Sequence, residues 1–112
     1  GNGEVTRDFT HVSDVVRANI LAMESARVGK GEIINIGAGN NISVNYLAQS
    51  IGVSAVYAPA RYEPNDTLAD NSKAREMLDW QPTVHFDKGI KEVVDFYVKE
   101  KVISYEHECE IA

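Results

Sequence analysis

The segment Glu32–Val44, "EIINIGAGNNISV", constrains the fold more than any other part of this sequence. Its short apolar run with three isoleucines indicates a strand buried on both faces. The glycines that follow, and then Ser43, indicate a turn into a helix that stops at Gly52. A second β-prone run, "VSAVYAPA", comes next, so the pattern predicts the strand–helix–strand crossover of an α/β domain.

The first thirty residues predict one strand and one helix. "EVTRDFTHV" alternates with the period of a strand and places Arg7 on the same face as Phe9. "SDVVRANILAMESARVGKG" has helical spacing of its apolar residues, with Ser13 or Asp14 as the expected N-cap. Together with the segment above, these patterns predict a small mixed α/β domain with short strands.

Two further helices are expected in the second half of the chain. "NSKAREMLDW" reads as a short helix closed by Pro82, and Trp80 is expected to be a packing anchor at its exit. "FDKGIKEVVDFYVKEK" is amphipathic, with Ile90, Val93, Val94 and Tyr97 on its apolar stripe. This brings the expected number of helices to about four. Residues 1–103 are predicted to form one domain, and residues 104–112 an acidic, flexible tail.

Composition excludes several classes of function. The net charge of the 112 residues is −6 and their basic residues are scattered, which argues against a nucleic-acid partner. No apolar run is long enough to span a membrane. The one cysteine has no companion ligands, so we expect no metal site and a reducing cytoplasmic location. The N-terminus lacks a signal peptide's features and does not begin with Met, so we expect a chain entered midway.

The glycine loop leaves two interpretations open: a phosphate cradle for a cofactor, or a structural turn. A dinucleotide fingerprint needs G-x-G-x-x-G at the start of a helix. Gly37 and Gly39 fit this spacing, but the third position is Ile42. The position of the ribose-binding acid falls near Tyr57, and the loop has no P-loop lysine. These departures favour the structural turn, and we expect no cofactor-binding residue in this chain.

A second spacing has the form of a catalytic pair. Tyr97 and Lys101 match Y-x-x-x-K, in which a lysine lowers the pKa of a catalytic tyrosine. Tyr97, however, falls on the apolar stripe of the last helix, and Lys101 suits a solvated helix end. We therefore assign no catalytic residue from this spacing.

Three segments carry a family resemblance that extends over nearly the whole chain. "RDFTHVSDVVRA" and "ADNSKAREMLDWQP" are its most specific pieces, and "IINIGAGNNISVNYLAQSIG" lies between them. In this order they resemble the C-terminal part of the NAD-dependent sugar epimerase/dehydratase family, the extended short-chain dehydrogenases that include UDP-glucose 4-epimerase. The resemblance implies the substrate-binding lobe of such an enzyme without its Rossmann lobe, which holds NAD and the catalytic tyrosine and lysine.

The resemblance also implies which residues bind the nucleotide-sugar. Arg7 matches the arginine of the family's R-D-F, and Arg61 matches the arginine of R-x-G-D/E; both would contact the diphosphate. This loop reads "RYEPND", without the glycine and one residue shorter than the pattern, so the acidic ribose contact stays open between Glu63 and Asp66. The residues alone allow a plainer interpretation, in which Arg7 pairs with a surface carboxylate and Arg61 is solvated.

Two further candidates come from the "GNG" at the start of the chain. Asn2 and Gly3 match a loop that lies along the nucleotide in the family. The family reaction removes a proton from a sugar hydroxyl as hydride moves to NAD, and then returns hydride to the opposite face of the keto-sugar. A chain without the Rossmann lobe is expected to bind a UDP-sugar, or another nucleotide-sugar, without turning it over.

Two other functions remain open at this stage. The chain could be a stand-alone α/β module that covers its exposed apolar face by self-association or by binding another protein. It could also be the corresponding lobe of a nucleotide-sugar dehydratase or reductase, since these relatives share the region. The first alternative predicts a stable oligomer that does not bind nucleotide-sugars.

Overall fold

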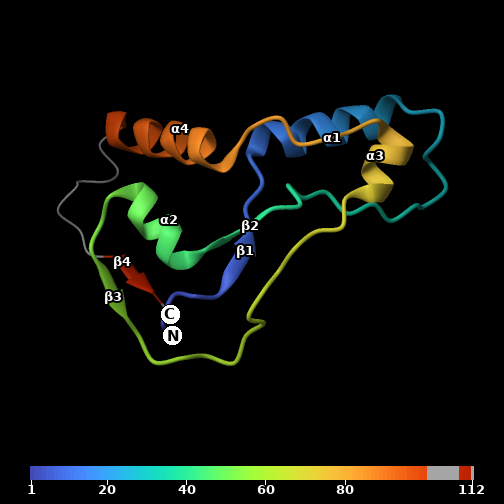
Figure 1. The fold of residues 1–112 in the computed structure, drawn as a ribbon. Coiled ribbons are helices and arrows are strands. Elements are labelled where there is room, and N and C mark those ends of the chain that lie inside the picture. Colours follow the sequence, from blue (N-terminus) through green and yellow to red (C-terminus); the bar gives the residue numbers. More distant parts are fainter. Residues whose placement is uncertain (101–108, 112) are drawn as a thin grey trace.

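The structure, a computed structural model, describes residues 1–100 and the backbone of 109–111 (Figure 1). Figure 1 shows α1 and α4 along one edge of the molecule, with β1 leading up to the start of α1. In chain order the elements are β1 (Thr6–Asp8), α1 (Val12–Glu24), β2 (Asn41–Ser43), α2 (Val44–Ile51), β3 (Ala55–Tyr57), α3 (Ser72–Leu78), α4 (Phe86–Lys99) and β4 (Cys109–Ile111).

The strands form two small sheets, so the predicted class, a small mixed α/β domain with about four helices, is confirmed. β1 pairs antiparallel with β2, with Arg7 opposite Ile42, and β3 pairs in parallel with β4. β4 lies within the segment expected to be a tail; residues 104–108 and 112 lie outside the described residues. The predicted 1–103 and 104–112 division thus stays a prediction.

The buried strand expected in "EIINIG" is not formed, and this prediction was wrong. Residues 32–36 have no strand partner among the described residues, and Ile33 is 83% exposed. Ile34 and Ile36 pack against the core, so only one face of the segment is covered. Without a ladder partner the segment does not build the predicted crossover, since β-strands need neighbours to satisfy their backbone groups.

The helix termini agree with the sequence at α2 and differ at α1. The Ser43 hydroxyl accepts from the Tyr46 N–H at 3.1 Å, and Gly52 ends α2 in the left-handed conformation. α1, by contrast, is capped by His11, whose Nδ1 accepts from the Ser13 N–H at 3.2 Å. The expected cap at Ser13 or Asp14 was therefore wrong, because the Asp14 side chain points inward and binds Thr83 and Val84.

The core joins α1 to α3 and to the segment that leaves α3. It consists of Ala18, Ala74, Leu78 and the fully buried Trp80, as the packing-anchor prediction requires. The molecule is elongated, with a radius of gyration of 16.6 Å, where about 13 Å is typical of a compact domain of this size. Because this core is small, polar contacts hold much of the arrangement of these helices in place.

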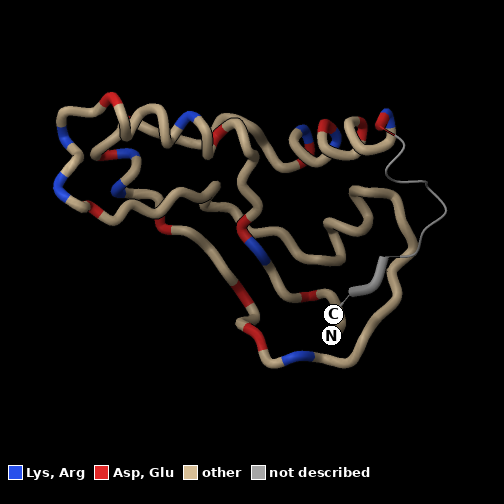
Figure 2. Tube along the Cα trace, turned by 180° about the vertical axis from the view of Figure 1, so that it is seen from behind, with Lys and Arg blue, Asp and Glu red and all other residues tan. Residues whose placement is uncertain are grey.

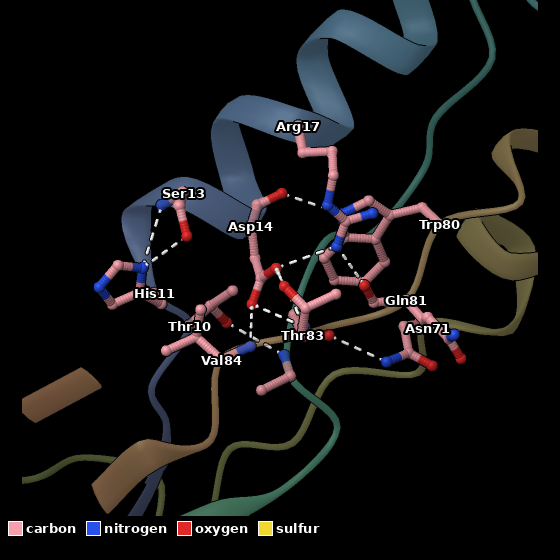
Figure 3. Close-up of polar contacts among 12 residues, drawn as sticks. Thr10, His11, Ser13, Asp14, Arg17, Asn71, Trp80, Gln81, Thr83 and Val84 are labelled. Atoms are coloured by element: carbon pink, nitrogen blue, oxygen red, sulfur yellow. Dashed lines mark hydrogen bonds and ion pairs between the residues drawn. The ribbon is translucent and has the colours of Figure 1, made fainter. Parts of the chain in front are cut away.

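The Asp14 carboxylate is the principal one of these polar contacts (Figure 3). It is 1% exposed and accepts from the Thr83 N–H, the Thr83 hydroxyl and the Val84 N–H at 2.7–3.1 Å. Arg17 donates to the same carboxylate at 2.9 Å, and its guanidinium lies over the Trp80 ring. Trp80 in turn donates its indole N–H to the Asp14 carbonyl at 2.9 Å. These contacts tie α1 to the segment that leads into α4.

The same contacts control the ionisation of Asp14. Burial alone would raise the pKa of this carboxyl, but the hydrogen bonds from Thr83, Val84 and Arg17 outweigh burial and lower the pKa to about 2. The ionised form is therefore the one that the fold stabilises. Its contribution is complete above the usual pKa of 3.8 and is lost as the pH falls through 2.

A second carboxylate, that of Asp8, organises the glycine loop. Asp8 accepts from the N–H groups of Ala38 and Gly39 at 3.0 and 2.9 Å, and from Ala69 N–H at 3.0 Å. The loop N–H groups that a phosphate would need are thus already bound to an anion of the chain itself. This favours the structural turn over the phosphate cradle.

Close packing explains why residue 37 is glycine. A Cβ at Gly37 would lie 2.3 Å from the Ala69 Cβ, well inside van der Waals contact. Asn71 also donates to the Gly37 carbonyl at 2.9 Å. The loop therefore serves as the contact between β1 and the segment that enters α3.

Charged residues are distributed unevenly: none occurs in residues 33–60, which include β2, α2 and β3. Figure 2 shows Lys and Arg interspersed with Asp and Glu along α1, α3 and α4 and on the loops beside them, whereas the stretch with α2 is uncharged. None of the helices in the described part of the chain combines the length and apolar character that crossing a membrane requires.

We predict that Asp14→Asn destabilises the fold by about 3 kcal/mol at pH 7, because an amide NH2 would face donors that now reach a carboxylate. In the wild type, the free energy of unfolding should fall by about 2 kcal/mol between pH 4 and pH 2 through this group. Urea unfolding at several pH values measures both effects, with Glu4→Gln as an exposed control. A D14N variant with wild-type stability and an unchanged pH profile would contradict the assignment.

We also predict that Gly37→Ala destabilises the chain by about 2 kcal/mol, because the new methyl group would overlap the Ala69 side chain. The double variant Gly37→Ala/Ala69→Gly should recover most of this loss. Urea unfolding of the three proteins gives the coupling between the two positions. Simple additivity of the two substitutions would refute this explanation.

Candidate functional site

Arg7 lies in the middle of β1 and is the centre of the candidate site. Successive strand residues point to opposite faces, so Arg7 faces away from Thr6 and Asp8. Its Nη1 donates to the Thr6 carbonyl at 2.7 Å and approaches the Asn65 carbonyl at 3.5 Å. Its Nη2 forms an ion pair with Glu63, and the Arg7 side chain remains 26% exposed. The guanidinium is therefore held in place while part of it stays accessible.

The segment after β3 returns along β1 and brings two of the predicted acids to it. Thr6 N–H donates to the Asn65 carbonyl at 2.8 Å, and Thr67 N–H donates to the Thr6 carbonyl at 3.2 Å. The Thr6 hydroxyl donates to Asp66 at 2.7 Å. The structure thus brings Glu63 to the Arg7 side chain and Asp66 to the side chain of Thr6, on the opposite face of β1. We refer to Arg7, Thr6 and these two acids as the cluster at β1.

Arg61 is not part of this cluster. Its side chain is exposed and makes no hydrogen bond or ion pair with the other described residues. Together with the next four residues it lines a shallow hollow on the loop. Glu63 and Asn65 connect this hollow to Arg7, because both line it and both accept from the Arg7 guanidinium.

Asn2 and Gly3 are fastened to the start of α2 by Asn45. The Asn45 side chain donates to the Asn2 carbonyl at 3.0 Å and to the Glu4 carboxylate at 2.6 Å, and its backbone N–H donates to the Gly3 carbonyl at 2.9 Å. A Cβ at Gly3, which has a φ of 75°, would meet the Asn45 side chain at 2.0 Å. Gly3 therefore has a structural reason to be glycine, independent of any ligand.

Tyr97, the tyrosine of the Y-x-x-x-K spacing, lies on α4 with an exposed side chain. Its ring packs edge-on against Phe96, with centroids 5.4 Å apart. Of the predicted apolar stripe of α4, Ile90 and Val94 are half-buried, but Val93 and Tyr97 are exposed, so this part of the prediction was wrong. Lys101, its expected partner, lies outside the described residues.

The cluster at β1 has the chemistry of an anion site. An arginine offers a planar fork of donors that matches a phosphate or a carboxylate, and Glu63 already uses one edge of it. No group of three potential metal ligands occurs among the described residues. At the glycine loop, a cofactor phosphate would have to displace the Asp8 carboxylate from the N–H groups of Ala38 and Gly39.

Sequence reasoning missed the roles of Asp8, Asp14 and Asn45, although one signal was available. Asp is depleted inside strands, so Asp8 in a β-prone run indicates a carboxylate with a specific partner. Its partners lie 30, 31 and 61 residues away in the chain, which no local pattern reveals.

Comparison with known proteins places the chain in a family. The family described as GDP-mannose 4,6 dehydratase matches residues 1–93. A putative UDP-glucose 4-epimerase of Methanocaldococcus jannaschii is 37% identical over 102 residues, which cover 86% of this chain and 32% of that protein. A dTDP-4-dehydro-6-deoxyglucose reductase and a UDP-N-acetyl-alpha-D-glucosaminuronate decarboxylase also match.

Solved structures of epimerases agree in fold. The UDP-glucose 4-epimerase of Thermotoga maritima with UDP-glucose has a TM-score of 0.78 at 39% identity, over 90% of this chain and 34% of that one. UDP-glucuronic acid 4-epimerase of Bacillus cereus, in complex with UDP-glucuronic acid and NAD, has a TM-score of 0.76 at 34% identity, again over 90% and 34%. The chain spans about a third of the length of these relatives. It belongs to the GDP-mannose 4,6-dehydratase family, within the NAD-dependent epimerase/dehydratase group of extended short-chain dehydrogenases.

Proposed function

We propose that this chain is the nucleotide-sugar-binding lobe of a UDP-sugar epimerase. Arg7 would hold the substrate's diphosphate, and the proton and hydride steps would take place on a Rossmann lobe that this sequence does not include. The observation that carries the proposal is the fixed guanidinium of Arg7, oriented by the carbonyls of Thr6 and Asn65. The names of the relatives, several of which are UDP-sugar epimerases, support the same substrate class.

The other candidates take supporting roles in this proposal. Arg61 lies on the exposed loop, two residues before Glu63, and would reach the second phosphate when the loop moves onto the ligand. Glu63 or Asp66 would accept ribose hydroxyls, with Asp66 already held beside β1 by Thr6. Asn2 and Gly3 would border the nucleotide. NAD, where the relatives bind it, supplies a hydride acceptor and donor; we assign it to the Rossmann lobe.

A second candidate function has its own supporting observation. α1 presents an uncovered apolar stripe made of Val12, Val16, Ile20 and Met23, and Met23 is 79% exposed. A stand-alone module would cover this stripe by self-association, whereas a lobe would cover it with the rest of its enzyme. A dehydratase or reductase lobe is the third possibility, because such proteins also match. The single cysteine keeps the cytoplasm as the predicted location of any of them.

We predict that UDP and UDP-glucose bind to the chain through Arg7. In an NMR titration of the 15N-labelled protein, the signals of Arg7 and of residues 61–66 should shift together. Arg7→Gln should weaken binding about tenfold or more, because a charged hydrogen-bonding fork is lost. The affinity of Arg7→Lys should lie between those of the wild type and Arg7→Gln, because lysine keeps the charge but lacks the planar fork of donors.

Arg27→Gln is the matched control, because it removes the same charge from an arginine that donates to the Glu76 carbonyl. Its affinity for UDP should equal that of the wild type. Absence of shifts at millimolar UDP, together with a stable oligomer in sedimentation equilibrium, would overturn the lobe hypothesis and favour the stand-alone module.

A further inference from the structure

In the part of the chain that the structure describes, the ion pair between Arg7 and Glu63 is the one polar contact that residues 59–64 make with the rest of the chain. Residues 59–64 are all exposed. Backbone hydrogen bonds fix the chain on either side, from Gly1 to the Ala58 carbonyl and from Thr6 to the Asn65 carbonyl. Among the described residues, the hydrogen bonds of 59–64 to the rest of the chain run through Glu63 alone. Glu63 is therefore the contact that extends the attachment at β1 from Asn65 and Asp66 into residues 59–64.

The same ion pair occupies the edge of Arg7 that an anion would use. Nη1 of Arg7 is directed at the carbonyls of Thr6 and Asn65, and Nη2 is bound to the Glu63 carboxylate. Carboxylates and phosphates select the same guanidinium edge because both offer paired oxygens to its parallel N–H groups. A phosphate that approaches Arg7 must therefore compete with Glu63.

Both partners are accessible enough for this exchange. The side chains of Arg7 and Glu63 are 26% and 35% exposed, so the pair is neither buried nor shielded from solvent ions. An ion pair of this kind contributes little stability, and breaking it leaves no charge stranded in the core. A group with more negative charge than one carboxylate can displace it.

We infer that Glu63 is an internal stand-in for the phosphate: it latches the 59–64 loop to Arg7 in the empty protein and is displaced by a diphosphate. The inference rests on the proposed function, in which Arg7 binds the diphosphate. When the diphosphate displaces Glu63, the 59–64 loop is released and Arg61 can move toward the bound ligand. Glu63 thereby lowers the affinity for the diphosphate.

Inorganic pyrophosphate tests the latch without a ribose, so a contact of Glu63 with the nucleoside cannot mask it. Glu63→Gln should lower the Kd for pyrophosphate about two- to fivefold, the range expected from an exposed ion pair. Glu4→Gln is the control: it removes the same charge near β1, where the carboxylate accepts from Asn45 and not from Arg7. Its Kd should remain within the error of the wild-type value.

A second readout follows the loop itself. In the 15N spectrum, the amide signals of the loop in ligand-free Glu63→Gln should move toward their positions in pyrophosphate-bound wild type. Calorimetric titrations with both UDP and pyrophosphate show which hypothesis fails, the binding of the diphosphate at Arg7 or the latch formed by Glu63.

The outcomes divide as follows. If Arg7→Gln weakens binding but Glu63→Gln has the wild-type Kd for pyrophosphate, or a higher one, the latch is overturned and the proposed function stands. If neither the wild type nor Glu63→Gln binds pyrophosphate or UDP, both are overturned. Binding by Glu63→Gln where the wild type shows none supports the latch.

Discussion

The hydrogen-bonded carboxylate of Asp14 is the interaction on which the rest of this small structure depends. It accepts from the backbone and side chain at Thr83 and from Val84, at the point where the chain turns from α3 toward α4. With Trp80 buried beside it, the carboxylate fixes the direction of α1 relative to both later helices. Few apolar side chains are fully buried here, so a charged contact carries an arrangement that larger domains maintain by packing.

A second carboxylate applies the same principle at β1. Asp8 draws the glycine loop and Ala69 toward one side of the strand, so that Arg7 is left on the other side. The two adjacent residues thus have opposite roles. Asp8 satisfies the N–H groups of the loop, and Arg7 offers its own donors to the surface. The glycine loop is scaffold for the strand that carries the arginine.

Sequence periodicity predicted the elements whose causes are local. Ser43 and Gly52 delimit α2 because a hydroxyl cap and a left-handed glycine act within one turn of the helix. Periodicity failed where a structure depends on residues far apart in the sequence. Ser13 or Asp14 was expected to cap α1, but the Asp14 carboxylate binds Thr83 and Val84, about seventy residues along the chain. The "EIINIG" strand failed for the same reason, since a strand needs a neighbour that the local pattern does not supply.

The candidate site, like the fold, could be predicted from the sequence only in part. Only the family resemblance pointed to Arg7, Glu63 and Asp66 as a group; the described structure places Glu63 against Arg7 and Asp66 against Thr6. The solvated position of Arg61 and the ion pair of Glu63 depend on how the loop after β3 lies, which local chemistry leaves undetermined. Three polar contacts with small energies, at Thr6, Asn65 and Glu63, set that position.

A crystal structure of the chain with UDP tests the central claim, that the phosphates bind at β1 and not at the glycine loop. The account predicts diphosphate oxygens about 2.7–3.2 Å from the Arg7 guanidinium, with Asp8 still bound to the N–H groups of Ala38 and Gly39. A diphosphate seated on those two N–H groups, with Asp8 displaced, would contradict it.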